Sequence, residues 1–325
     1  MIRARLFRAG QPAVELETGA LEAGRVDEGD LVWLDLEAPT EQELEQALTP
    51  FGVDPHALGV LRRPNRRPVV RVYREHFLVA ALSVEVCEER VGPRIGVVEL
   101  DILVGRKFLI SLHKQHRPLP FSEELELRTA TNPYLSGLPS TYLLYILLDT
   151  IVGHYAREFD DVEDRVERLE EQLLRQPGRA ALDEATMMKR HVLNLRRLVA
   201  PHREAFGVLA AADIPLVREA QVEVYFRDLV DHLDEFVDRL DHARDVLTGA
   251  FNLYLSNISH RSNQELRVLT FLSAVLLPMT VITGLFGTNF ALTEYQSWEP
   301  FYLMLAGMGV LAAGMLAYMR WRHWL

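Results

Sequence analysis

Two uncharged apolar runs near the C-terminal end dominate the hydropathy pattern. Residues 268–287 and 301–319 contain no Asp, Glu, Lys or Arg. At about 1.5 Å rise per residue, a helix over the first run is about 30 Å long, which matches the hydrocarbon core of a bilayer. The pattern therefore predicts two transmembrane helices at 268–287 and 301–319, joined by a short extracytoplasmic loop at 288–300 and followed by a basic tail at 320–325.

Basic residues flank this hairpin on one side only. Arg261 and Arg267 precede the first run and Arg320 and Arg322 follow the second, whereas the loop at 288–300 has no Lys or Arg. Positively charged flanks stay in the cytoplasm. We therefore expect a multi-pass protein of the cell (inner) membrane with both termini in the cytoplasm.

The first part of the chain alternates short β-rich runs with helical patches. Residues 1–135 are therefore predicted to form a cytoplasmic α/β domain. Thr40, followed three residues later by Glu43, has the pattern of a helix N-cap. The predicted strands are at 31–36, 69–73, 77–86, 97–105 and 108–113.

Almost everything after residue 135 has helical periodicity. Residues 136–215 are predicted to be an antiparallel acidic helix pair, broken near Pro177. No proline occurs between residues 216 and 277, so residues 216–267 are predicted to be the cytoplasmic part of a long stalk helix. If this stalk continues unbroken through 268–287, it is about 108 Å long.

A polar seam follows the predicted stalk in alternating steps of three and four residues. This spacing places its members on one face of a slightly supercoiled helix. The seam is acidic at first, then small and polar, and finally mixed with leucines. Its members are Asp228, Asp231, Glu235, Asp238, His242, Asp245, Gly249, Asn252, Ser256, Ser259, Asn263, Leu266, Thr270, Ser273, Leu277, Thr280, Gly284 and Gly287.

Several interpretations of this seam are open. Its acidic part also fits a solvated helix face, and its membrane part also fits simple helix packing. A polar stripe inside a membrane otherwise indicates a water-filled path, and one helix cannot enclose a path, so conduction requires several copies around an axis. In the second run, Gly309, Ala313 and Ala317 recur at spacing four and predict a packing face for a first-run helix.

Composition narrows the function classes. The 35 Lys and Arg residues against 46 Asp and Glu residues give a net charge of −11, which argues against a nucleic-acid partner. The single cysteine, Cys87, excludes a disulfide framework. The sequence contains no Gly-rich phosphate loop, nucleophile elbow or catalytic carboxylate pair, so we expect neither an enzyme, nor an ATP-driven pump, nor a resident cofactor.

The tetrapeptide Gly287-Thr288-Asn289-Phe290, directly after the first apolar run, resembles the pore mouth of the CorA-type divalent-cation channels. That family carries a Gly-Met-Asn signature there. Stretches such as YFRDLVDHLDEF in the stalk are also similar to the family, and the resemblance covers nearly the whole chain. Thr288 replaces the methionine of the signature, and this position also varies in the ZntB-like zinc-transporting branch.

The resemblance implies a funnel-shaped homopentamer whose first span lines the pore, with the Asn289 carboxamides in a ring at the mouth. It implies further polar rings at Asn263, Thr280 and the Gly284 carbonyl, and hydrophobic constrictions at three leucines, Leu266, Leu269 and Leu277. Asp228 resembles the stalk half of a regulatory intersubunit metal site, and the approximate matches for its partner are Glu85, Glu88 and Glu89.

The predicted function is a membrane channel that admits Mg²⁺ to the cytoplasm down its electrochemical gradient and tolerates Co²⁺ and Ni²⁺. The first alternative is a Zn²⁺ transporter of the same fold, driven by proton coupling. The second alternative is a non-conducting membrane scaffold, in which the polar stripe only packs helices.

Overall fold

The computed structural model consists of two compact units, residues 1–250 and 251–325, each described here by itself. Helix α7 (Glu223–Gly287) contributes its first part to one unit and the remainder to the other. The residues that the structure describes are 2–8, 13–16, 30–63, 67–89, 92–114, 128, 137–175, 178–287 and 299–321.

A mixed sheet of seven described strands forms the centre of the first unit, in the order β2-β1-β3-β7-β6-β5-β4. Strands β3 and β7 pair in parallel, and every other neighbouring pair is antiparallel. The strands are β1 (Ile2–Phe7), β2 (Val14–Leu16), β3 (Leu31–Glu37), β4 (Val69–Val72), β5 (His76–Glu89), β6 (Gly92–Gly105) and β7 (Phe108–His113).

All five strands predicted from the sequence are present, and β5 extends further than expected. Strands β1 and β2 were not predicted. Strand β1 pairs with β3 from Ile2 opposite Leu36 to Phe7 opposite Leu31. Two arginines alternate with its apolar residues, and one of them, Arg5, lies 5.3 Å from the centre of the Trp33 ring across the strand pair.

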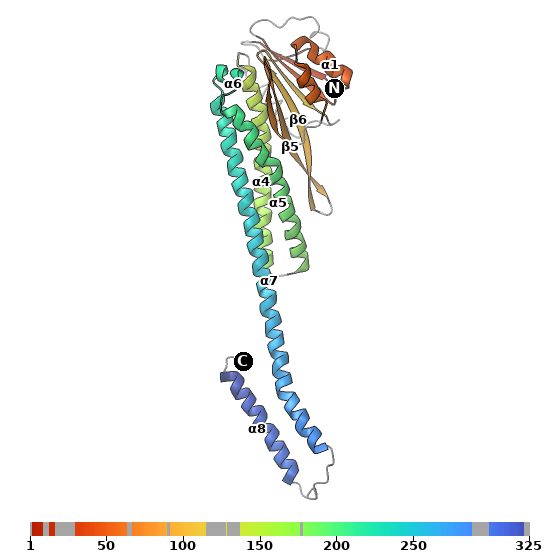
Figure 1. Cartoon of the computed structure of the whole chain (residues 1–325), viewed down its shortest axis with the longest axis vertical. Coiled ribbons are helices and arrows are strands. Elements are labelled where there is room, and N and C mark those ends of the chain that lie inside the picture. The colour runs from red at the N-terminus through yellow and green to blue at the C-terminus, as the bar shows by residue number, and fades with distance from the viewer. Residues whose placement is uncertain are drawn as a thin grey trace. The chain divides into compact units, whose positions relative to one another are not determined.

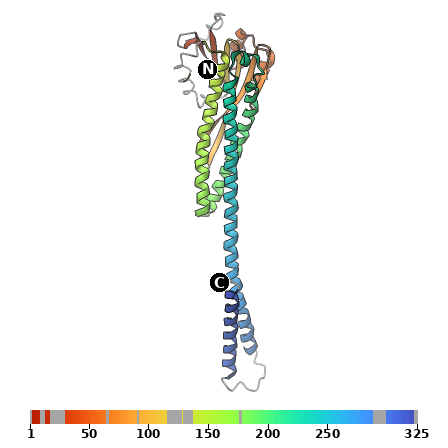
Figure 2. The same cartoon turned by 90° about the vertical axis from the view of Figure 1, so that its left-hand side faces the viewer.

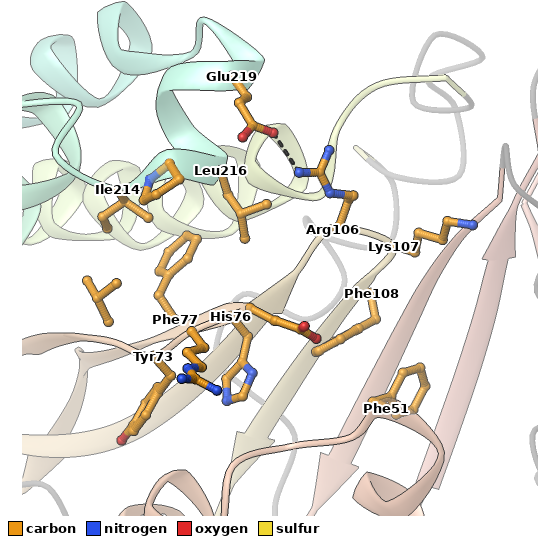
Figure 3. Close-up of a pocket in the computed structure, with 14 residues that line it drawn as sticks. Phe51, Tyr73, His76, Phe77, Arg106, Lys107, Phe108, Ile214, Leu216 and Glu219 are labelled. Carbon is orange, nitrogen blue, oxygen red and sulfur yellow. Dashed lines mark hydrogen bonds and ion pairs between the residues drawn. The ribbon is translucent and has the colours of Figure 1, made fainter.

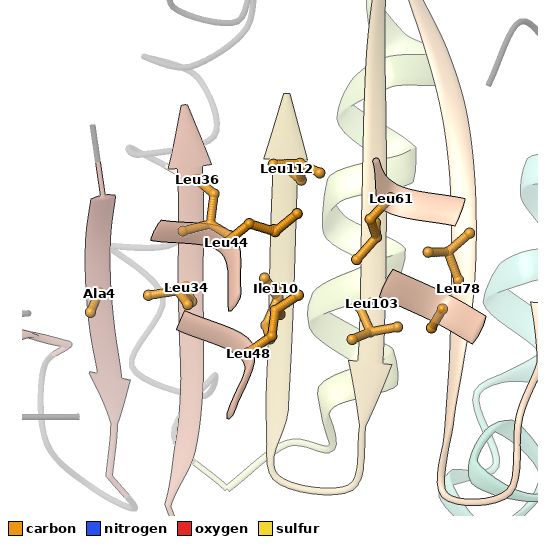
Figure 4. Close-up of a cluster of buried hydrophobic side chains, with 11 residues drawn as sticks. Ala4, Leu34, Leu36, Leu44, Leu48, Leu61, Leu78, Leu103, Ile110 and Leu112 are labelled. Atoms are coloured by element: carbon orange, nitrogen blue, oxygen red, sulfur yellow. The ribbon is translucent and has the colours of Figure 1, made fainter. Parts of the chain in front are cut away.

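Short helices cover one face of the sheet: α1 (Glu41–Leu48), the 3-10 turn η2 (Thr49–Phe51) and α2 (Pro55–Leu61). The predicted N-cap is confirmed, because the Thr40 hydroxyl accepts from the Glu43 N–H at 3.3 Å and the Glu43 carboxylate accepts from the Thr40 N–H at 2.8 Å. Leu44 and Leu48 of α1 pack into a core with Leu34, Ile110 and neighbouring sheet residues (Figure 4).

Two long antiparallel helices cover the opposite face: α4 (Ser140–Arg175) and α5 (Arg179–Ala210) (Figure 1). Both hold the same sheet residue, Leu82. The Tyr155 hydroxyl of α4 donates to the Leu82 carbonyl at 2.5 Å, and the Leu82 N–H donates to Nε2 of His202 on α5 at 2.9 Å. The helix pair is therefore fixed to the sheet by buried hydrogen bonds as well as by apolar packing.

The expectation of one unbroken helix from residue 216 to residue 287 is wrong at its start. A separate helix, α6 (Pro215–Ala220), ends at Gln221, whose φ of 56° is left-handed. The Gln221 N–H caps α6, and the turn carries the Val222 side chain into the core. Neither glycine nor proline marks this break, so it has no local signal in the sequence.

The second unit contains the rest of α7 and helix α8 (Glu299–Trp321). Both helices are long and apolar enough to cross a membrane, and no residue of their most apolar windows is buried. Helix α8 runs back alongside α7 in both views (Figures 1 and 2). One stripe on each helix is partly covered: Phe271, Ala274, Val275, Pro278, Met279 and Ile282 on α7, and Met304, Met308, Ala312, Met315 and Met319 on α8.

The small residues predicted as a packing face of the second span lie elsewhere on α8. Gly309, Ala313 and Ala317 are exposed in the single chain. The side of α8 that is covered within one chain instead carries four methionines, whose unbranched side chains fill irregular gaps between helices.

Candidate ion pathway along helix α7

Within the first unit, α7 buries an apolar seam against the helix pair. Its members also follow steps of three and four residues, but they start two residues before the polar seam. Phe236 contacts Phe159 of α4 with ring centroids 4.6 Å apart, and Phe226 contacts Tyr145 at 6.4 Å. The buried members are Phe226, Leu229, Leu233, Phe236, Leu240, Ala243, Leu247 and Ala250.

The predicted acidic seam lies on the opposite side of the same helix. An offset of two residues is about 200° around an α-helix, so burial of one seam turns the other outward. Every predicted member in this unit is accordingly exposed: Asp228, Asp231, Glu235, Asp238, His242, Asp245 and Gly249. Helices α4 and α5 therefore leave this polar face of α7 uncovered.

The flanks of α7 form ion pairs with the neighbouring helices α4 and α5. On the flanks, Asp234 pairs with Arg203 at 2.5 Å and Asp241 with Arg196 at 2.9 Å, both across to α5. Arg239 pairs with Glu163 of α4 at 2.7 Å, and this guanidinium lowers the pKa of the Glu163 carboxyl.

The outer face has no such balance of charge. Within the described part of the chain, four of its carboxylates have no ion-pair partner: Asp228, Asp231, Glu235 and Asp238. Asp245 pairs with the adjacent Arg244 at 2.8 Å. This row of unpaired carboxylates produces a negative potential that attracts cations.

In the second unit, the predicted pore-lining residues lie on the side of α7 away from α8. Three of the six partly covered residues follow a seam residue by two positions, and the other three follow one by a single position: Val275 follows Ser273 by two, and Met279 follows Leu277, which is 67% exposed. The seam therefore lies on the side of the helix away from the stripe that faces α8. The predicted pore-lining residues here, which are the seam members and Leu269, are all exposed: Asn252, Ser256, Ser259, Asn263, Leu266, Leu269, Thr270, Ser273, Leu277, Thr280, Gly284 and Gly287.

The threonines of this stripe present oxygen acceptors. The Thr270 hydroxyl donates to the Leu266 carbonyl at 2.8 Å, and the Thr280 hydroxyl donates to the Leu276 carbonyl at 2.8 Å. Each hydroxyl proton is thus used inside the helix, and the oxygen lone pairs remain available. Because the water shell of a cation donates hydrogen bonds outward, this surface suits a hydrated cation better than an anion.

Two groups of predicted site residues are only partly described. Gly287 is the last residue of α7, and Thr288 and Asn289 lie outside the described residues. Glu85, Glu88 and Glu89 belong to strand β5, but their side chains are not among those described. In the described part of one chain, no three His, Cys, Asp or Glu residues form a metal-binding group. The intersubunit pairing of Asp228 with a β5 glutamate stays a prediction.

The sequence interpretation missed the apolar seam that orients α7. The signal was present, because Leu229, Leu233 and Phe236 have the same spacing as the polar residues. Two seams offset by two residues indicate a helix that packs one side against protein and leaves the other side free. The polar seam alone does not indicate which side is packed.

Comparison with known proteins identifies the family to which this chain is similar. Residues 28–321 match the model of a family described as CorA-like Mg²⁺ transporter proteins. The cobalt/magnesium transport protein CorA of Thermotoga maritima is 34% identical over 276 residues, which cover 85% of this chain and 78% of that protein. The zinc transport protein ZntB of Yersinia enterocolitica is 24% identical over 237 residues, or 70% and 68% of the two chains.

A solved structure gives the same result for the fold. The complete CorA magnesium transporter of Methanocaldococcus jannaschii superimposes with a TM-score of 0.79 at 21% identity, covering 99% of this chain and 98% of that one. The family match covers strands β3 to β7 and the two apolar C-terminal helices. The chain belongs to the CorA-like Mg²⁺ transporter family.

Proposed function

We propose that this chain is one subunit of a pore for divalent metal cations in which α7 lines the path and Mg²⁺ is the preferred ion. One observation carries the proposal: the polar stripe of α7 lies opposite the side that α8 covers, so it is free to face other copies. Thr270, Ser273 and Thr280 lie in a span long enough to cross a bilayer. Polar residues in such spans face a water-filled cavity or a bundle interior rather than lipid.

Five copies around one axis enclose the path, as the resemblance to CorA implies, and both termini lie in the cytoplasm of the cell (inner) membrane. Each α7 then contributes its exposed stripe to the pore and its other side to α8. A divalent cation that moves inward through −100 mV gains about 4.6 kcal/mol, so no second energy source is needed.

Selectivity in this proposal arises at the outer end of α7. A ring of Asn289 side chains offers neutral amide oxygens, which bind Mg²⁺ through the water shell that this ion gives up reluctantly. Co²⁺ and Ni²⁺ pass as tolerated ions. Further in, Leu266, Leu269 and Leu277 form apolar rings that close the pore by expelling water.

Feedback by intracellular Mg²⁺ is the part of the proposal that depends on Asp228. Mg²⁺ bound between Asp228 and Glu85, Glu88 or Glu89 of an adjacent subunit favours the closed pentamer. In Asp228→Lys, we expect Mg²⁺ inside the vesicle to inhibit transport less, whereas Asp238→Lys, which makes the same change on the same face, leaves inhibition unaltered. Equal inhibition in both variants would remove Asp228 from regulation.

A Zn²⁺ transporter of the same fold is the second candidate. Two observations favour it: Thr288 stands where the CorA signature has methionine, and ZntB zinc transport proteins are among the relatives. The same Asn289 ring serves either ion. Proton coupling distinguishes the candidates, because a passive Mg²⁺ pore responds to the membrane potential and not to a pH gradient.

The test is ion flux into proteoliposomes loaded with a Mg²⁺- or Zn²⁺-sensitive dye, with the potential and the pH gradient imposed separately. The proposal expects Mg²⁺ entry that follows the potential and is indifferent to pH, and a loss of that entry in Asn289→Ala. Zn²⁺ entry that requires a proton gradient, with little Mg²⁺ entry, would establish the second candidate. No flux of either ion through a verified pentamer would favour a non-conducting scaffold.

A further inference from the structure

A cavity of about 560 Å³ lies in the first unit, where four segments that are distant in sequence meet (Figure 3). They are the end of η2, the β4–β5 turn, the β6–β7 turn and helix α6. None of them belongs to the polar face of α7. Ligand pockets in proteins typically have volumes of about 300–1,000 Å³, so this cavity has the size for a small organic molecule.

Aromatic rings form much of the cavity wall. Phe51 and Phe108 contact each other with centroids 4.8 Å apart, and Tyr73 stacks on His76 at 5.2 Å. Phe108 occupies the space directly beside the Cα of Gly105, where an added Cβ would collide with the ring. The absence of a side chain at residue 105 therefore sets where the Phe108 ring lies.

His76 is a buried residue whose ring supplies one hydrogen-bond donor. Its side chain is 5% exposed, and its Nε2 accepts the Asp54 N–H at 3.4 Å. Because Nε2 is the acceptor, the neutral ring carries its proton on Nδ1. Burial lowers the pKa of His76, which keeps the ring neutral at pH 7. His76 lines the cavity, so this Nδ1–H is the ring donor that it offers there.

Three basic residues line the same cavity: Arg74, Arg106 and Lys107. Arg106 pairs with Glu219 of α6 at 2.7 Å, as the dashed line in Figure 3 shows. Arg74 is exposed and Lys107 half-buried, and neither pairs with an acid within the described ranges. Glu75 is the other acidic lining residue, so the basic residues are in excess by one charge.

We propose that this cavity binds a nucleoside phosphate, with the base against the aromatic wall and the phosphate toward Arg74 and Lys107. The Nδ1–H of His76 donates to an acceptor on the ligand. A free inorganic phosphate would leave the aromatic wall unused, and a purely apolar ligand would leave the basic residues and the His76 donor unused. The proposal concerns the sheet domain and does not depend on conduction.

Such a ligand contacts both sides of the Arg106–Glu219 ion pair, which joins the β6–β7 turn to α6. Helix α6 leads through the left-handed residue Gln221 directly to the start of α7. A bound nucleotide therefore stabilises the junction from which α7 begins.

The test is isothermal titration of the full-length protein in detergent with ATP, ADP, adenosine and inorganic phosphate. The free Mg²⁺ concentration is held constant, so that chelation by ATP does not change the occupancy of cation sites. We expect ATP and ADP to bind saturably, and adenosine and phosphate each to bind at least about tenfold more weakly, because each carries half of the recognised groups. No binding of either nucleotide, or phosphate binding as tight as that of ATP, would overturn the proposal.

Matched variants locate the site. Arg74→Glu reverses a charge at the cavity and should weaken ATP binding about tenfold or more, because charge-assisted contacts to phosphate are lost. Arg71→Glu makes the same change on exposed strand β4, outside the cavity lining, and should leave binding unaltered. Gly105→Ala, which displaces the Phe108 ring, should also weaken binding.

Equal ATP affinity in Arg74→Glu and Arg71→Glu would place any nucleotide site elsewhere and refute this one. Because the readout is binding in detergent, the result is separate from ion flux. A failure here leaves the pore proposal standing, and a failure of the flux assay leaves this site standing.

Discussion

From Glu223 to Ala250, helix α7 buries a row of eight apolar residues against α4 and α5, whereas no described residue of α7 beyond Ala250 is buried. Both parts nevertheless have a polar seam of the same spacing. The first part exposes its polar seam and hides its apolar one. The second part also exposes its polar seam, with Leu277 67% exposed and Thr280 also exposed, but its opposite stripe is only partly covered and none of its described residues is buried.

The solvent explains the difference. In water, an exposed polar face is satisfied and an exposed apolar face requires a partner. In lipid the requirement is reversed, because the tails cover leucines at no cost but offer nothing to a hydroxyl or a backbone carbonyl. The membrane part of α7 is therefore incomplete on its polar side, which is the side where we place the other copies.

The largest expected effect comes from truncating the buried seam. Leu233→Ala removes a fully buried side chain at the interface with the helix pair and should lower the free energy of unfolding by about 3 kcal/mol. Asp231→Ala, two residues away on the exposed face, should change it by less than about 0.5 kcal/mol. Denaturant unfolding in detergent, followed by circular dichroism, measures both. Equal losses would mean that the two seams are not distinct in burial.

Acid should destabilise the first unit through His202. Burial lowers the pKa of this histidine to about 4, below its ordinary value of 6.5. Between these values the unfolded chain binds a proton that the folded chain does not, so stability falls as pH falls through this window. We expect about 1.5 kcal/mol to be lost from pH 6.5 to pH 5, because the slope approaches 1.36 kcal/mol per pH unit only once the unfolded histidine is mostly protonated.

The control for this prediction is His202→Gln, which retains a hydrogen-bonding side chain but does not titrate. Its unfolding free energy should be less steep in pH over the same window. An unchanged slope would assign the acid sensitivity to other groups. The second unit has no buried histidine among its described residues, so the comparison also tests whether the two units respond to pH separately.

Much of the fold follows from local patterns. Five strands, the Thr40 capping box and the break between α4 and α5 were all predicted, because each has a signal within a few residues. Strand β1 was missed although it has a local signal, because Arg3 and Arg5 alternate with apolar residues. The break at Gln221 was missed because it depends on burying Val222, a tertiary effect that no local window contains.

The candidate site was also predictable only in part. The spacing of Thr270, Ser273 and Thr280 predicted one polar face, and the structure adds that α8 lies on the opposite side. The cavity around His76 could not be predicted from the sequence, because its lining comes from four separate segments and includes no motif. Similarly, the covered side of α8 carries methionines and not Gly309 and Ala313. This could not be predicted because it depends on how α7 and α8 are rotated about their own axes.

The polar stripe can be tested with a matched pair of threonines. Thr280→Val removes an oxygen from the stripe at nearly constant volume and should reduce Mg²⁺ flux into proteoliposomes about tenfold, the effect of about 1.4 kcal/mol. Thr283→Val makes the same change three residues on, where the residue lies outside the seam series, and should have little effect. Equal loss in both variants would mean that helix stability, and not an oxygen on the pore side, accounts for the decrease.

The smallest expected effect lies on the flank of α7, between its buried and exposed seams. Arg239 is 26% exposed and pairs with Asp160 and Glu163 of α4, each at 2.7 Å. Asp160 is 71% exposed, so water screens much of this attraction. Arg239→Met keeps the apolar stem, loses the charge, and should cost about 0.5–1 kcal/mol of unfolding free energy at low salt. Added salt should shrink that difference, because it screens exposed pairs, whereas the loss in Leu233→Ala should persist. A salt-independent loss in Arg239→Met would show that packing, and not charge, holds this flank to the helix pair.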